Sequence, residues 1–189
     1  MSEYLENVSV LIVDDQDVIR SIIRQILKAL GCNKIKDAVD GNQAWDMAAV
    51  LNPDIIITDW EMEQMNGLEL THRLRTHPQS PAPYVPIIMV TGYGEIERVI
   101  EARDYGVNEY IIKPISAKSM FSRIHSIIDN PRSFVRTKYY FGPDRRRRAV
   151  PTPENRRRPV QAVDKNKMEA AEGNQRTEER SHGLMRANQ

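Results

Sequence analysis

The chain has 189 residues, a length that is enough for one well-buried domain and a shorter extension. It has a single cysteine, Cys32, which excludes an internal disulfide. Charged residues interrupt every apolar stretch and the N-terminus lacks the blocks of a secretion signal, so we expect a cytoplasmic protein without a membrane span. The net charge of +1 conceals an acidic part, with 12 basic against 19 acidic residues over 1–131, and a basic part, with 10 against 2 over 132–160.

Apolar patterns of two kinds alternate along residues 8–129. Residues 8–13 form a run rich in β-branched side chains, typical of a strand buried on both faces. From Asp17 to Leu30 apolar residues recur at steps of three and four, as on one face of a helix, and Gly31 ends it. The same alternation predicts strands at 34–39, 54–58, 87–90 and 107–112, and helices at 41–51, 67–76, 95–104 and 116–129. Five such units predict an α/β fold with a parallel sheet covered on both sides.

The alternation stops after Pro131, where prolines lie among arginines and large apolar residues are few. We therefore expect a domain over 1–131, an arginine-rich extension without a core over 132–160, and a polar, disordered tail over 161–189. Within the tail, residues 162–181 could form only an exposed helix, interrupted by Gly173. Before the fourth strand, the proline-rich stretch 77–86 predicts a rigid surface excursion.

Polar side chains follow four of the predicted strands, and these ends meet at one edge of a parallel sheet. They are Asp14 and Asp15, Asp59, Thr91, and Lys113. Three crowded carboxylates repel one another unless a cation such as Mg²⁺ neutralises them. The set predicts a metal-assisted phosphoryl site, with Asp59 as nucleophile, Lys113 neutralising developing charge and Thr91 donating its hydroxyl. Taken singly, each Asp could be a helix cap or turn residue, and Lys-Pro a surface bend.

Residues 8–129 resemble a response-regulator receiver domain of the CheY-like family through VLIVDDQ, DIIITDWEMEQMNGLEL, MVTG and YIIKP. The resemblance implies a flavodoxin-like fold of strand order 2-1-3-4-5, a phosphoryl donor that is a sensor histidine kinase or phosphotransfer protein, and a signalling role in which the receiver supports its own phosphotransfer and dephosphorylation. It also implies that the main-chain carbonyl of Glu61 is a metal ligand, beside Asp14, Asp15 and Asp59. Tyr110 would turn inward when Thr91 moves toward the phosphate. Glu63 departs from the proline that most family members have there.

The extension combines aromatic residues, a Gly-Pro-Asp turn and two arginine clusters. Arginine matches the guanine edge and phosphate, an acid can accept hydrogen bonds from guanine, and aromatic rings stack on bases. The candidate ligand-binding residues are Tyr140, Asp144, Arg145, Arg146, Arg147, Arg148, Arg156, Arg157 and Arg158. This mixture resembles the CheY-like cyclic di-GMP effectors, which implies cyclic di-GMP as ligand and the flagellar motor switch protein as a partner.

Other functions compete with this interpretation. The basic extension could attract nucleic acid or anionic lipid through charge alone, or it could be a solvated tail that folds back on the acidic domain. It is too short and too polar for a specific DNA-binding domain. An aspartate-nucleophile phosphatase would place a second Asp two residues after Asp59, where this chain has Glu61, and would carry an inserted cap domain.

Overall fold

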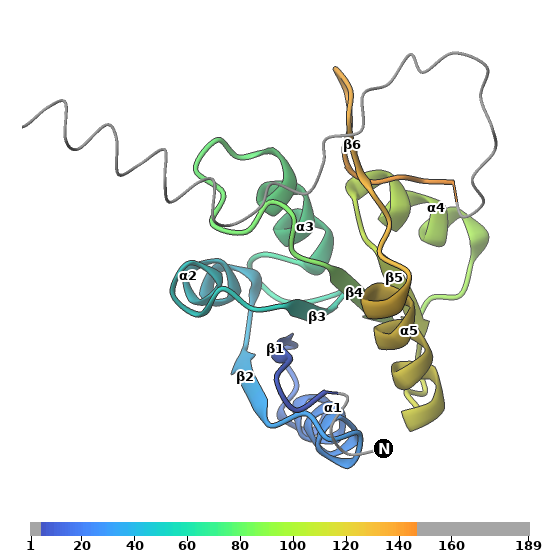
Figure 1. Ribbon diagram of the computed structural model, residues 1–189. Coiled ribbons are helices and arrows are strands. Elements are labelled where there is room, and N and C mark those ends of the chain that lie inside the picture. The colour runs from blue at the N-terminus through green and yellow to red at the C-terminus, as the bar shows by residue number, and fades with distance from the viewer. Residues whose placement is uncertain (1–4, 147–189) are drawn as a thin grey trace, which may run out of the picture.

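The computed structural model describes residues 5–146, and these form a five-stranded parallel sheet with helices on both faces and a short hairpin at its end (Figure 1). The strand order β2-β1-β3-β4-β5 confirms the predicted topology. The elements in chain order are β1 Ser9–Val13, α1 Asp17–Ala29, β2 Lys34–Ala38, α2 Gly41–Leu51, β3 Ile55–Asp59, α3 Gly67–Thr76, β4 Ile87–Thr91, α4 Ile96–Tyr105, β5 Glu109–Ile112, α5 Ala117–Asp129, β6 Phe134–Arg136 and β7 Phe141–Pro143.

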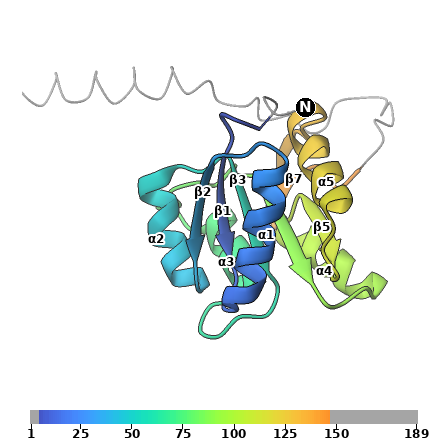
Figure 2. The same ribbon diagram turned by 90° about the horizontal axis from the view of Figure 1, so that it is seen from below.

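The central strands separate two apolar cores. In β3, Ile56 packs into one core and its neighbours Ile55 and Ile57 into the other, because successive strand side chains point to opposite faces. Helices α2, α3 and α4 cover one face of the sheet, and α1 and α5 cover the other (Figures 1 and 2). One core therefore lies under the first three helices and the other under the remaining two. The unbroken apolar runs of the sequence are therefore the strands that both layers cover.

Caps set where several helices begin and end. The Asp40 carboxylate accepts hydrogen bonds from the main chain at the start of α2, and Asn66 forms a capping box with Glu69 at the start of α3. Gly31 follows α1 with a φ of 91°, a backbone conformation that favours glycine. Within residues 5–146, no helix combines the length and the apolar character that crossing a bilayer requires.

The prediction that residues 132–160 form no packed structure is wrong for their first part. β6 and β7 form an antiparallel hairpin, and the Phe141 side chain is only 7% exposed. Tyr84, from the proline-rich stretch 77–86, meets the rings of Phe134 and Phe141 edge-on, with centroids 5.4 and 5.2 Å apart. The stretch that looked like a simple surface excursion thus carries the docking partner of the hairpin.

Arg75, in the last turn of α3, is a second contact of the hairpin. Its guanidinium lies 5.0 Å from the Phe134 ring centroid and donates hydrogen bonds to the carbonyls of Pro83, Val85 and Gly106. Gly142 of β7 passes so close to Gly106 that a Cβ on Gly142 would lie 2.9 Å from the Gly106 Cα. The hairpin therefore packs at the amino ends of β4 and β5. The expected helix at 162–181 and the rest of the tail lie outside the described residues.

Candidate functional site

Five polar side chains meet at the carboxyl edge of the sheet. Asp59 and Thr91 are the last residues of β3 and β4, while Asp14 and Lys113 directly follow β1 and β5. These strands are neighbours in the sheet, so the fold brings together residues up to about one hundred positions apart in sequence. Carboxylate oxygens of Asp14, Asp15 and Asp59 all lie within 4.8 Å of one another.

Lys113 supplies positive charge to this acidic pocket. Its Nζ atom lies 3.1 Å from Oδ1 of Asp59 and 3.8 Å from Oδ2 of Asp14. Asp14 is fully buried, and its Oδ2 atom accepts no hydrogen bond. A buried carboxylate oxygen without a donor, beside two further carboxylates, is the donor set that a small divalent cation such as Mg²⁺ prefers.

Burial raises the pKa of both inner carboxyl groups. For Asp14 the pKa rises from 3.8 to about 6, mainly through loss of hydration, although the amide of Gln16 donates a hydrogen bond that opposes the rise. Burial also raises the pKa of Asp59, and the Lys113 ammonium opposes that rise. The pocket is therefore energetically costly when all of its acids are ionised, and a bound cation would relieve that cost.

We expect this cost to appear in the pH dependence of stability. Without metal, the folded protein holds a proton on Asp14 more tightly than the unfolded chain does between pH 3.8 and about 6. The free energy of unfolding should therefore fall by roughly 2 to 3 kcal/mol as pH rises through that window, relative to an Asp14→Asn variant that lacks the titration. Urea unfolding of both proteins across this range measures the difference.

Mg²⁺ should stabilise the wild type at about pH 8 and not at about pH 5, because only the ionised site binds it. Equal stabilisation at both pH values would contradict this account.

Aromatic residues form the rim of the acidic pocket. The Tyr110 hydroxyl donates a 2.8 Å hydrogen bond to the carbonyl of Tyr93, and its ring meets Trp60 edge-on with centroids 6.3 Å apart. The Tyr93 hydroxyl in turn donates to the Glu61 carboxylate at 2.7 Å. The contact between Glu61 and Tyr93 could not be predicted, because it joins two loops and leaves no local pattern in the sequence. The roles predicted for the Glu61 carbonyl and for movement of Tyr110 stay predictions.

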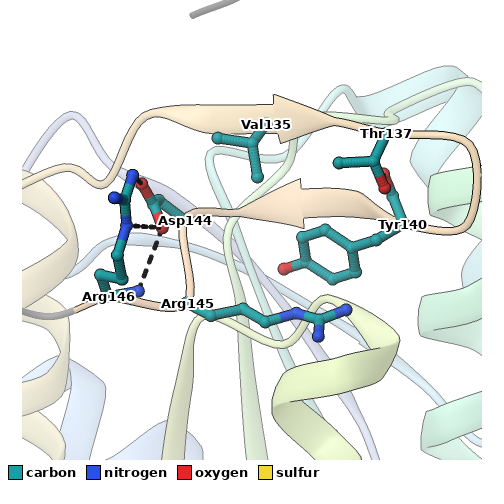
Figure 3. A pocket seen from close by; sticks show the side chains of 6 residues that line it. All are labelled: Val135, Thr137, Tyr140, Asp144, Arg145 and Arg146. Atoms are coloured by element: carbon teal, nitrogen blue, oxygen red, sulfur yellow. Dashed lines mark hydrogen bonds and ion pairs between the residues drawn. The ribbon is translucent and has the colours of Figure 1, made fainter. Parts of the chain in front are cut away.

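A second candidate site lies on the hairpin. Four predicted ligand-binding residues, Tyr140, Asp144, Arg145 and Arg146, line a cavity of about 200 Å³ together with Val135 and Thr137 (Figure 3). We call it the hairpin cavity. The Asp144 carboxylate accepts from the Arg146 guanidinium at 2.9 Å, and the Arg145 guanidinium lies over the Tyr140 ring, 3.9 Å from its centroid. The other predicted residues, Arg147, Arg148, Arg156, Arg157 and Arg158, lie outside the described part of the chain.

Comparisons with known proteins agree with the fold. Residues 10–125 match the family model described as the response regulator receiver domain. The chain belongs to this family of two-component signalling proteins, which accept a phosphoryl group on an aspartate.

Its relatives include chemotaxis proteins of the CheY type. The chain is 34% identical to chemotaxis protein CheY-3 of Vibrio cholerae, over 66% of its own length and 94% of that protein. It is 35% identical to chemotaxis protein CheY of Pseudomonas aeruginosa, over 64% and 95% of the two chains. Among solved structures, CheY4 of Vibrio cholerae matches with a TM-score of 0.58 and 28% identity over 64% of this chain and 98% of that one. The family match ends at residue 125, before the hairpin.

Proposed function

We propose that this protein is a response regulator that accepts a phosphoryl group on Asp59. The supporting observation is the position of the Asp59 carboxylate, which lies 3.1 Å from the Lys113 ammonium and beside two further carboxylates at the carboxyl edge of the sheet. An Asp59 oxygen attacks the phosphorus of the donor, the bond from phosphorus to the donor atom breaks, and the donor leaves with the electron pair. The donor is a sensor histidine kinase or a phosphotransfer protein.

The surrounding residues have separate roles in this transfer. Asp14, Asp15, Asp59 and the carbonyl of Glu61 would hold Mg²⁺, which neutralises charge on the phosphoryl oxygens when bound. Lys113 pairs with a phosphoryl oxygen, and the Thr91 hydroxyl donates to another. Movement of Thr91 toward the phosphate opens space that Tyr110 fills, which carries the signal to the surface. Attack of water on the phosphorus returns the carboxylate, so the same site supports dephosphorylation.

Labelling with acetyl phosphate tests this function. The wild type should gain one phosphoryl group when Mg²⁺ is present and none when the ion is chelated, and intact mass distinguishes the two. Absence of labelling under both conditions would contradict the proposal. The variant that identifies the acceptor residue is Asp59→Ala.

We also propose that the extension binds cyclic di-GMP. The observation that favours a specific ligand is the gathering of Tyr140, Asp144, Arg145 and Arg146 around one cavity. A ring already stacked with an arginine offers a face for a guanine base, and the two guanidinium groups offer donors for phosphate. The names of the relatives point to chemotaxis, and the flagellar motor switch protein is the output partner that we propose.

Calorimetry with cyclic di-GMP tests the ligand. Replacing both Arg145 and Arg146 by alanine should weaken binding by at least about tenfold, because each removes a charged hydrogen-bond donor from the hairpin cavity. A control variant with Lys28→Ala and Lys34→Ala removes the same charge from exposed positions in α1 and β2 and should bind as the wild type does. If the control loses affinity equally, or if any dinucleotide binds as well and raised salt abolishes the heat, charge alone explains the binding.

A further inference from the structure

Arg145 borders two hollows in the surface. One is the hairpin cavity. The other, which we call the α4–β5 groove, has a volume of about 260 Å³ and is lined by Val99 and Ile100 of α4, Tyr110 of β5, and Arg132 and Arg145 among others. A residue shared by two sites can carry an effect from one to the other only if both sites compete for it or move it.

Arg145 makes a contact on each side. On the hairpin side its guanidinium stacks on Tyr140 with 3.9 Å between its Cζ atom and the ring centroid. On the other side, its Nη1 atom lies 3.3 Å from Oδ1 of Asp104, in the last turn of α4. A phosphate bound in the hairpin cavity would compete with Asp104 for this guanidinium, since both are anions.

Arg132 provides a second connection, which joins the hairpin to β5. Its guanidinium donates hydrogen bonds to the main-chain carbonyls of Asn108 and Asp144, the latter at 3.3 Å. It also lies 3.9 Å from the carboxylate of Glu109, which is only 4% exposed and directly precedes Tyr110 in β5. The wall of the hairpin cavity is therefore joined to the start of β5.

The carboxyl end of β5 reaches the acidic pocket, where Lys113 directly follows the strand. Tyr110 lines the α4–β5 groove, and its hydroxyl donates to the carbonyl of Tyr93 in the segment that joins Thr91 to α4. A displacement of Thr91 and Tyr110 therefore has two packed routes to Arg145, one along α4 to Asp104 and one along β5 to Arg132.

We propose that occupancy of the hairpin cavity and phosphorylation of Asp59 are coupled through the contact between Arg145 and Asp104. This inference rests on the proposed function of the two sites. When phosphorylation repositions α4, Asp104 releases Arg145, and the guanidinium becomes available to the nucleotide phosphate. Coupling of this kind is reciprocal, so the bound nucleotide also favours the phosphorylated state.

Calorimetry with cyclic di-GMP and the full chain, with and without beryllofluoride and Mg²⁺, tests this coupling. Activation should tighten binding by about three- to fivefold, the effect expected of one exposed ion pair. Asp104→Asn should bind as tightly without activation and gain nothing from it. The control Glu101→Gln removes the same charge from α4 at a position that pairs with Arg98 instead, and should behave as the wild type does. Equal affinity of the wild type in both states would overturn the coupling.

Hydrogen exchange gives a result that does not depend on the ligand. Beryllofluoride with Mg²⁺ should speed exchange in residues 134–146 of the wild type and of Glu101→Gln, and not in Asp104→Asn, where the contact is already absent. If cyclic di-GMP produces no heat in any state, the proposed ligand is wrong, and the exchange result decides the coupling alone. Unchanged exchange in the activated wild type would then overturn it.

Discussion

Replacing Asp59 by alanine should abolish phosphoryl transfer to this protein completely. Asp59 is the inner carboxylate nearest Lys113, at 3.1 Å, and it ends β3 at the mouth of the acidic pocket. Alanine removes the attacking oxygen itself, whereas loss of a supporting group such as Lys113 would only slow the step. Intact mass after incubation with acetyl phosphate and Mg²⁺ measures the outcome.

The control for this variant is Asp46→Ala, because Asp46 is an exposed aspartate on α2. It should accept one phosphoryl group as the wild type does. Beryllofluoride provides a second measurement, since Trp60 directly follows Asp59 and contacts Tyr110, so its fluorescence should change in the wild type and in the control only. Undiminished labelling of Asp59→Ala would place the acceptor on another residue.

Replacing Arg75 by alanine should destabilise the protein by about 2 to 4 kcal/mol and loosen the hairpin. The guanidinium is buried, and burial lowers the pKa of Arg75 to about 9, which still leaves it charged at neutral pH. It donates to the carbonyls of Pro83, Val85 and Gly106, and alanine would leave these acceptors, of which the last two are buried, without that donor. Relief of the buried charge offsets part of the loss, which is why we expect less than the sum of the hydrogen bonds.

Urea unfolding measures this effect, and limited proteolysis within residues 132–146 reports the release of the hairpin. The matched control is Arg73→Ala, in the same helix, where the half-buried guanidinium lies 4.3 Å from the centroid of the half-buried Trp45 ring. Its loss should cost less than about 1 kcal/mol and leave proteolysis unchanged. An Arg75→Ala protein as stable as this control would show that the hairpin is held by its aromatic contacts alone.

The sheet and the acidic pocket could be predicted because they depend on local patterns and one general rule. The run Ile55, Ile56, Ile57 marks a strand buried on both faces, and parallel strands must bring their carboxyl ends to one edge. Asp14, Asp59 and Lys113 therefore had to meet once the five strands were placed. The observed boundaries differ from those predictions by at most two residues, and the helices predicted at 41–51 and 67–76 begin and end as predicted.

The hairpin could not be predicted because its strands have three residues each and its packing partners are distant in sequence. Phe134 and Phe141 both contact Tyr84, some fifty positions earlier, and Phe134 also contacts Arg75. Nothing local distinguishes such aromatic residues from those of an unfolded, arginine-rich segment. The sequence features that pointed to the hairpin were the long proline-rich stretch and the aromatic cluster before the arginines. Their contact becomes evident only in the folded structure.

The hairpin packs near the amino ends of β4 and β5, against Tyr84 and Gly106, whereas the acidic pocket lies at their carboxyl ends. A kinase that phosphorylates Asp59 and a small anion that binds beside Tyr140 would thus approach opposite ends of the sheet. Neither would exclude the other, so one copy of the protein could receive both signals at the same time.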